Sequence, residues 1–329
     1  MRNDLEPVQF GIISTAAINA HVLAGVASSP SVEIRAVASR SQATADAYAA
    51  VNGIATAHGS YEAMLADPEI EAVYVSLPNS LHVEWSILAL KAGKHVICEK
   101  QLDRRVSEVG RAFEAADRAG RIFAEAFMYR HHPQTALFAK LAATRIGRLR
   151  TIRVSLGGTL VGADNVRLRT ELDGGALMDV GCYCVNAARM LGGEPEVAIG
   201  RRIVGPSGVD MRFAGLLTFP DDVIATFDCG FDLAPTAVVE AVGSHGTVRA
   251  VDPFLLQSSS IELTVGDEAT ERIDVPIADS YRLEFENLAA AIRGTAAPLL
   301  GRPDAIGQAR ALEALYGSAE NGGEPVHLA

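Results

Sequence analysis

Long apolar runs are missing from this sequence of 329 residues. No stretch of about 18 uncharged apolar residues occurs, which is the length a helix needs to cross a bilayer, so we expect no membrane span. The first ten residues include Asp4, Glu6 and Pro7 and contain no apolar core, so we also expect no secretory signal. We therefore expect a cytoplasmic protein without a membrane partner.

Cysteine is scarce as well. The four cysteines are Cys98, Cys182, Cys184 and Cys229, and no two of them form a C-x-x-C pair. This spacing argues against a disulfide framework or a zinc site and favours buried, reduced thiols. The adjacent His131 and His132 lack the spacing of a ligand set. We expect no metal.

Positive charge is in deficit, because the net charge is −11. An acidic surface repels nucleic acid and anionic lipid, so neither is expected as a partner. Hydrophobic residues make up 49% of the chain and charged residues 21%, which is typical of a globular protein. The length suggests about two domains.

Strands and helices alternate in the first half of the chain. Short apolar runs predict strands at residues 8–13, 32–38, 71–76, 95–98 and 122–126, with helical segments between them. This alternation is typical of a parallel sheet, in which ligands bind outside the carboxyl ends of the strands.

The turn after the first strand lacks the glycines of a dinucleotide-binding loop. G-x-G-x-x-G is expected there, but the aligned stretch runs from Ser14 to Asn19 without glycine. Serine and alanine are small, and backbone amides at a helix N-terminus bind pyrophosphate whatever the side chain. The stretch is therefore either an ordinary strand-to-helix turn or a phosphate loop, whose contacts would come from Ser14, Thr15, Ala16, Ala17 and Ile18.

The tip of the second strand is more informative. A carboxylate there would hold the ribose of NAD, whereas an arginine favours the 2′-phosphate of NADP. This chain has Ser39 and Arg40 and no carboxylate. A hydroxyl beside a guanidinium suits a phosphate, so NADP is predicted in preference to NAD. A solvated surface role for Arg40 is the alternative.

The pattern changes after residue 149. Alternating segments predict strands of an antiparallel meander, separated by a helix at residues 178–190 and followed by helices at 285–293 and 305–316. An open sheet buries one face on helices and leaves the other to be covered. A second subunit is the simplest cover, so a homodimer or homotetramer is expected.

Several short motifs occur in a characteristic order. They lie at residues 10–18, 37–40, 77–82, 98–100, 125–133, 174–183 and 281–285. Together they resemble the glucose–fructose oxidoreductase, inositol dehydrogenase and MocA (Gfo/Idh/MocA) family over nearly the whole chain. The resemblance implies an α/β protein with a Rossmann-type parallel sheet, followed by an α+β domain with a large, open, mainly antiparallel sheet that often pairs between subunits. It also implies a bound nicotinamide cofactor and an active site between the domains. The predicted domains are residues 1–126 for the dinucleotide and 127–329 for substrate and oligomerisation.

The family's catalytic motifs fall on Lys100 and on Asp179, Gly181 and Tyr183. Two departures stand out. Gln101 replaces the usual proline after the lysine, which leaves the backbone there open, and Tyr183 replaces the usual histidine. Tyrosine at this place resembles the dimeric dihydrodiol dehydrogenases and the NADP-dependent xylose dehydrogenases.

These residue types suit alcohol oxidation. The cofactor takes the hydride and the protein must handle the proton. A nearby ammonium favours phenolate, so Lys100 beside Tyr183 would make the phenol a usable acid/base, while Asp179 would orient a substrate hydroxyl. Alone, Asp179 could be a helix-end charge and Tyr183 a core phenol.

The remaining site residues are assigned by position. Tyr129 and Arg167 are predicted to bind substrate. The further cofactor contacts are predicted at Leu77, Pro78, Asn79, His82, Glu99, Lys100 and Tyr281.

The sequence thus predicts an NADP-dependent oxidoreductase acting on a sugar, polyol or dihydrodiol. Two alternatives stay open. One is elimination or glycoside cleavage assisted by a retained NAD(H), and the other is a nucleotide-sensing regulator without catalysis.

Overall fold

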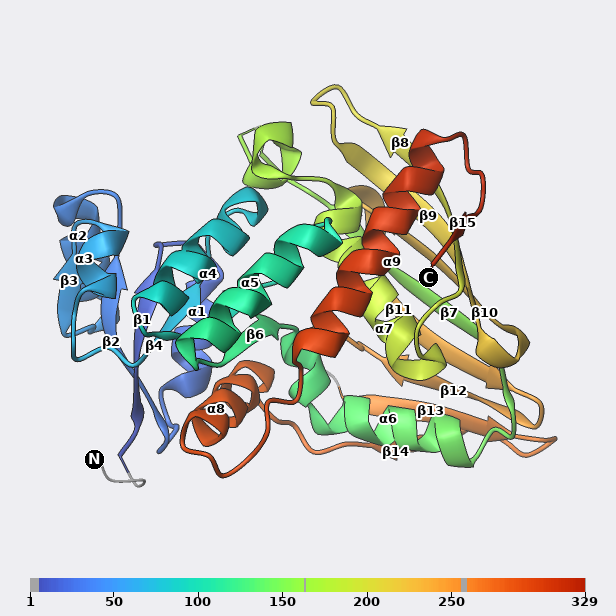
Figure 1. The fold of residues 1–329 in the computed structure, drawn as a ribbon. Coiled ribbons are helices and arrows are strands. Elements are labelled where there is room, and N and C mark those ends of the chain that lie inside the picture. The colour runs from blue at the N-terminus through green and yellow to red at the C-terminus, as the bar shows by residue number, and fades with distance from the viewer. Residues whose placement is uncertain (1–5, 163, 256–258, 329) are drawn as a thin grey trace. The chain divides into compact units, whose positions relative to one another are not determined.

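The computed structural model describes residues 6–162, 164–255 and 259–328. The chain divides into two compact units (Figure 1). The first unit comprises Met1–Asp103, Ser107–Met128 and Asp279–Ala305, and the second comprises Arg104–Val106, Tyr129–Ala278 and Ile306–Ala329. The segment Asp279–Ala305 therefore packs with the N-terminal sheet, although it follows the second sheet in the chain.

The first unit is built on a six-stranded parallel sheet of order β3-β2-β1-β4-β5-β6. Its strands are β1 (Val8–Ile13), β2 (Val32–Ala38), β3 (Thr56–His58), β4 (Ala72–Val75), β5 (His95–Glu99) and β6 (Phe123–Ala126). Its helices are α1 (Asn19–Val26), α2 (Gln42–Asn52), α3 (Tyr61–Leu65), η1 (Asn79–Leu81), α4 (His82–Lys91), α5 (Val106–Ala119) and α8 (Ser280–Ile292). The predicted parallel sheet is confirmed, and the short β3 is an addition to it.

Apolar side chains explain the packing of this unit. The rings of Phe10 on β1 and Phe285 on α8 lie 5.2 Å apart, and Tyr74 on β4 meets Phe285 edge-on at 5.4 Å. All three side chains are buried. Burial of a large aromatic side chain stabilises the fold by about 1.5–3 kcal/mol, so these contacts hold α8 to the sheet.

The second unit contains a nine-stranded sheet of order β14-β13-β12-β11-β7-β10-β9-β8-β15. The strands are β7 (Leu149–Thr159), β8 (Val197–Val204), β9 (Asp210–Phe219), β10 (Val223–Gly230), β11 (Asp232–Gly243), β12 (Gly246–Val251), β13 (Ser260–Val265), β14 (Glu271–Asp274) and β15 (Val326–His327). The predicted meander needs one correction, because β10 pairs with β7 in parallel. The sheet is therefore mixed, although it is mostly antiparallel.

Helices cover one face of this sheet (Figure 1). They are α6 (Pro133–Thr144), α7 (Cys182–Gly192) and α9 (Arg302–Glu320), with the short helices η2 (Met128–His131), η3 (Val166–Leu168), η4 (Thr170–Leu172) and η6 (Pro220–Asp222) in the connections. On β7, Ile152 and Val154 are buried towards the helices, whereas Arg153 between them is exposed on the other face.

The helix predicted at residues 178–190 differs from an ordinary α-helix at its start. It begins with a π-helical segment, η5 (Leu177–Gly181), and continues as α7. A π-helical turn is wider than an α-helical one and is often found at functional sites. Asp179 lies on this segment and Tyr183 follows it on α7.

No helix within the described residues is long and apolar enough to span a membrane. The same residues contain no cluster of three or more His, Cys, Asp or Glu side chains arranged to hold a metal ion.

Candidate active site

The strand-to-helix turn after β1 contains a serine in an unusual conformation. Ser14 has φ of 116°, in the region that favours glycine. Two hydrogen bonds of the Ser14 hydroxyl compensate for this unfavourable backbone conformation. The hydroxyl donates to the carbonyl oxygen of Ser76 at 2.9 Å and accepts from the amide of Ala16 at 3.1 Å. Asn19 also donates to the Ser14 carbonyl at 3.0 Å. The turn thus holds a glycine-like backbone without glycine, and it leads into the N-terminus of α1.

The half-buried Thr15, Ala16 and Ile18 and the exposed Ala17 complete this turn. The amides of Asn19, Ala20 and His21 donate to the carbonyl oxygens of Ala16, Ala17 and Ile18, so an anionic group would be held by amides of the turn that precede the helix. Such a turn can accept an anionic group.

At the tip of β2, Ser39 is buried and its amide donates to the carbonyl oxygen of His58 at 3.0 Å. Arg40 is exposed, and no carboxylate in the described part of the chain forms an ion pair with it. Ser41 then caps α2 by accepting from the amide of Thr44 at 3.2 Å. The tip therefore offers a free guanidinium beside a helix N-terminus, which suits a phosphate.

His82 joins two strand ends. Its Nε2 lies 2.6 Å from the carbonyl oxygen of Leu77, and its Nδ1 lies 2.8 Å from that of Gln101. Burial lowers the pKa of His82 to about 4, and the nearby Lys100 ammonium acts in the same direction. The neutral ring can donate to one of the two oxygens. His82 is only 1% exposed, so its role is to fix the loops that carry Pro78, Asn79 and Lys100.

Glu99 ends β5 and Lys100 follows it, and both residues are half-buried. The phenol of Tyr74 donates to Oε1 of Glu99 at 2.5 Å, and the Lys100–Gln101 peptide bond is cis. Gln101 is buried, and its side-chain amide donates to the carbonyl oxygen of Asp103 at 3.2 Å.

Tyr281 on α8 stacks on the ring of His21, with 5.7 Å between the ring centroids. Burial raises the pKa of Tyr281, and the carboxyl groups of Glu99 and Glu284 raise it further. Burial also raises the pKa of Glu284 well above its usual range, and Glu99 adds to this. Tyr281 thus stands in the same acidic cluster as Glu99. Glu284 was not singled out by the sequence, because one glutamate in an amphipathic helix gives no signal of burial.

In the second unit, Asp179 is held by Arg167. The Arg167 Nε donates to Oδ2 of Asp179 at 2.7 Å. Arg167 reaches it because the loop turns back at a glycine pair: the amide of Gly175 donates to the Arg167 carbonyl at 3.0 Å, and a Cβ on Gly174 would overlap that carbonyl. The structure therefore brings together Arg167 and Asp179, two of the residues that were predicted to bind substrate.

Tyr183 is half-buried in an aromatic cluster. Its ring lies 5.8 Å from that of Tyr129 and 5.4 Å from that of Phe254. Tyr129 itself is buried, and its phenol donates to Oδ1 of Asn186 at 2.6 Å. Tyr129 was predicted to contact substrate, but here its ring supports Tyr183 and its hydroxyl is engaged by Asn186.

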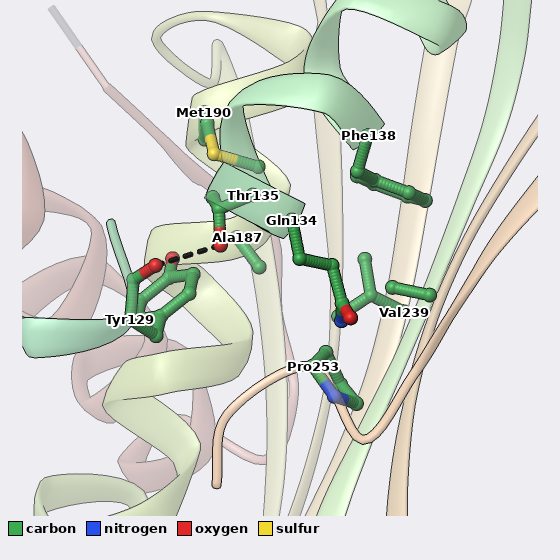
Figure 2. A pocket seen from close by; sticks show the side chains of 9 residues that line it. Tyr129, Gln134, Thr135, Phe138, Ala187, Met190, Val239 and Pro253 are labelled. Atoms are coloured by element: carbon green, nitrogen blue, oxygen red, sulfur yellow. Dashed lines mark hydrogen bonds between the residues drawn. The ribbon is translucent and has the colours of Figure 1, made fainter. Parts of the chain in front are cut away.

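An apolar pocket lies behind Tyr129, between α6, α7 and the sheet (Figure 2). Figure 2 shows Gln134 reaching towards Val239 and Pro253, and the Thr135 hydroxyl donating to the Tyr129 carbonyl oxygen at 2.7 Å. Neither Asp179 nor Tyr183 lines this pocket. It belongs to the packing between helices and sheet.

The predicted catalytic residues thus fall in separate units. Lys100 belongs to the first unit with the predicted cofactor contacts, and Asp179 and Tyr183 belong to the second with Arg167. The first unit contains a sheet edge that can accept a phosphate, and the second contains a carboxylate and a phenol.

Comparisons with known proteins identify the family of this chain. Residues 8–127 match the Gfo/Idh/MocA oxidoreductase family with its NAD-binding Rossmann fold, and residues 136–249 match the Gfo/Idh/MocA C-terminal domain. The chain is 37% identical to D-xylose 1-dehydrogenase (NADP(+)) 2 of Haloferax volcanii, with 96% of this chain and 98% of the relative covered. It is 32% identical to trans-1,2-dihydrobenzene-1,2-diol dehydrogenase of Bos taurus, with 85% and 84% covered.

A solved structure is similar to this chain over nearly its whole length. The 3-ketoreductase of Actinomadura kijaniata in complex with NADP and TDP-benzene superposes with a TM-score of 0.88 at 29% identity, covering 95% of this chain and 98% of that one. Variants of that enzyme with a lysine replaced by alanine, or a tyrosine by phenylalanine, have been solved with the same ligands. The predicted family, fold class and enzyme class are confirmed: this chain belongs to the Gfo/Idh/MocA family of oxidoreductases.

Proposed function

We propose that this protein is an NADP-dependent dehydrogenase or reductase that moves a hydride between the nicotinamide and a hydroxyl-bearing carbon of a sugar or related polyol. The observation that carries the proposal is the phosphate-accepting tip of β2, where Arg40 is exposed without an ion-pair partner in the described part of the chain. Two relatives support it, because the xylose dehydrogenase is an NADP enzyme by name and the 3-ketoreductase is solved with NADP.

The residues of the first unit fit this cofactor. The turn from Ser14 to Ile18 would hold the pyrophosphate at the N-terminus of α1. Ser39 and Arg40 would hold the 2′-phosphate, and Glu99 would accept hydrogen bonds from a ribose. Leu77, Pro78, Asn79 and Tyr281 would complete the contacts. When bound, NADP supplies the hydride acceptor or donor.

The protein's own part of the reaction is proton transfer and orientation. We assign Tyr183 as the acid/base, with Lys100 favouring its phenolate form. Asp179, fixed by Arg167, would accept a hydrogen bond from a substrate hydroxyl and so set which carbon faces the nicotinamide. The rings of Tyr129 and Phe254 hold the Tyr183 ring in place.

The proposed cofactor preference is tested by titrating wild type, R40A and R35A with NADPH and with NADH. Arg35 is the matched control, because it lies on β2, the strand that leads to Arg40, but pairs with Glu69. We expect wild type to prefer NADPH by about tenfold or more, or about 1.4 kcal/mol. R40A should lose most of that preference and R35A should keep it. Equal binding of the two cofactors by wild type would contradict the assignment of Ser39 and Arg40.

We further propose that the protein is a homo-oligomer joined through the outer face of the nine-stranded sheet. Paired residues on neighbouring strands form a row across this face, Arg153, Glu240, Arg249, Glu262 and Arg272. Arg153 and Glu240 form an ion pair at 2.5 Å. A row of alternating sign is self-complementary, because a second copy turned by a two-fold axis can place arginine against glutamate.

A cytoplasmic location is part of the same proposal. All four cysteines are buried thiols, which fits a reducing compartment.

A further inference from the structure

Asp210, which no sequence motif singles out, lies at the start of the π-helical segment that carries Asp179. Its Oδ2 accepts from the amide of Leu177, the first residue of η5, at 2.7 Å. Asp210 comes from the start of β9 and is only 3% exposed. The first amides of a helix need an external acceptor, and a buried one left without it costs about 1–3 kcal/mol.

The Asp210 carboxyl group is itself fixed from the other side. Its Oδ1 accepts from the phenol of Tyr316 on α9 at 3.1 Å. The guanidinium of Arg104 stacks on the Tyr316 ring at 4.2 Å and forms an ion pair with Asp173. Burial raises the pKa of Asp210, whereas the hydrogen bonds from Leu177 and Tyr316 and the charge of Arg104 act in the opposite direction. The carboxylate therefore has one orientation, with one oxygen for each partner.

The loop before η5 is shaped around the same carboxyl group. Gly175 has φ of 126°, and a Cβ at this position would overlap Oδ1 of Asp210. Only glycine fits between Asp210 and the start of the π-helical segment. Gly175 and Asp210, which are distant in sequence, are thus in close contact where the helix begins, and this contact leaves no room for a side chain at position 175.

We propose that Asp210 is a positioning residue for the reaction: by anchoring the amide of Leu177 it fixes η5, and with it the side chains of Asp179 and Tyr183. The inference rests on the proposed function for its catalytic consequence. The anchoring itself does not depend on the identity of the substrate.

The test compares D210A, which removes the acceptor, with D210N, whose Oδ1 can still accept from Leu177. The control is S318A. Ser318 is a buried side chain of the same unit whose hydroxyl accepts from the amide of Gly200 at 2.9 Å, so its loss also removes a backbone acceptor. Three quantities are measured for each variant: amide hydrogen exchange over residues 176–183, the affinity for NADPH, and kcat and KM for an aldose.

We expect D210A to raise amide exchange in this segment and to lower kcat, each by about tenfold or more, with NADPH affinity within about twofold of wild type. D210N should recover most of both losses, and S318A should change neither. A general loss of stability would not single out this segment or be relieved by asparagine.

The proposal is overturned if D210A leaves the exchange within twofold of wild type, if S318A exposes residues 176–183 equally, or if D210N behaves like D210A. Should D210A fail to fold, Y316F decides, because it removes only the hydroxyl that orients the carboxyl group. Y316F should raise the exchange of residues 176–183 severalfold, and an unchanged exchange overturns the proposal. If wild type turns over no sugar, the proposed function fails, whereas the exchange measurement still decides the role of Asp210.

Discussion

The phenol of Tyr74 donates a 2.5 Å hydrogen bond to the carboxylate of Glu99, the residue that precedes Lys100. Tyr74 and Glu284 are both fully buried, and Glu284 and Tyr281 are electrostatically coupled to Glu99. Burial disfavours ionisation of Glu284, and the neighbouring Glu99 carboxyl group disfavours it further, so Glu284 stays neutral. A neutral carboxyl group therefore lies next to the end of β5, beside the residue that precedes the predicted catalytic lysine.

Glu284 should make stability depend on pH in a definite direction. Its pKa is raised in the folded state above the usual value of 4.5, so its stabilising effect is complete below pH 4.5 and is lost as the pH rises through the folded pKa. E284Q cannot ionise, and its stability relative to wild type should therefore increase with pH. Urea unfolding at pH 4.5 and 7.5 measures this. The control is E284D, which keeps a titrating carboxyl group and should behave like wild type. If E284Q and wild type differed in free energy of unfolding by the same amount at both pH values, the neutral state of Glu284 would be contradicted.

Ser14 should tolerate glycine better than alanine. S14A keeps the φ of 116° and loses the bonds to Ser76 and Ala16, which predicts a destabilisation of about 1–3 kcal/mol. S14G loses the same bonds but relieves a backbone strain of about 1–3 kcal/mol. Urea unfolding of the two variants compares them directly. If S14G proved less stable than S14A, the strain assigned to this turn would be wrong.

Arg167 should matter for catalysis more than for stability. Its side chain is 45% exposed, so its ion pair with Asp179 adds at most about 1 kcal/mol to the free energy of unfolding. R167A should nevertheless lower kcat/KM by about fivefold or more, because Asp179 loses its orientation. R302A is the matched control: Arg302 is equally exposed and pairs with Asp117 at the same distance of 2.7 Å. A similar loss of activity in R302A would count against a role for Arg167 at the site.

The charge row on the outer sheet face should control assembly. The double variant E240K/E262K makes all five positions positive, so two copies would repel each other. We expect wild type to be a dimer or tetramer by light scattering and the double variant to be a monomer. E69K/E114K, with the same charge change on exposed carboxylates of the first unit, should keep the wild-type mass. A double variant that still assembles would place the interface elsewhere.

The parts of the structure that repeat simple patterns could be predicted from the sequence. Alternating apolar runs predicted the parallel sheet, and β1 and β2 have the bounds that these runs predicted, residues 8–13 and 32–38. The absence of a carboxylate after β2 pointed to NADP, in agreement with the relatives.

Features that depend on contacts distant in the chain could not be predicted. At the π-helical start of the 178–190 helix, the amide of Leu177 donates to Asp210, which lies 33 positions later in the chain. β10 pairs with β7 in parallel because β7 lies between the consecutive strands β10 and β11, an order that periodicity does not specify. Likewise, Ser14 can replace a glycine only because Ser76, on another strand end, provides a partner for its hydroxyl.

The central claim is that this protein transfers a hydride between NADP and a sugar, with Tyr183 as the acid/base. The most direct measurement is the formation of NADPH absorbance when wild type and Y183F are mixed with NADP and a panel of aldopentoses and aldohexoses. We predict that wild type accumulates one NADPH per sugar oxidised, and that Y183F binds NADPH normally but loses about 100-fold or more in kcat. Sugar conversion without net NADPH, or full activity in Y183F, would contradict the account.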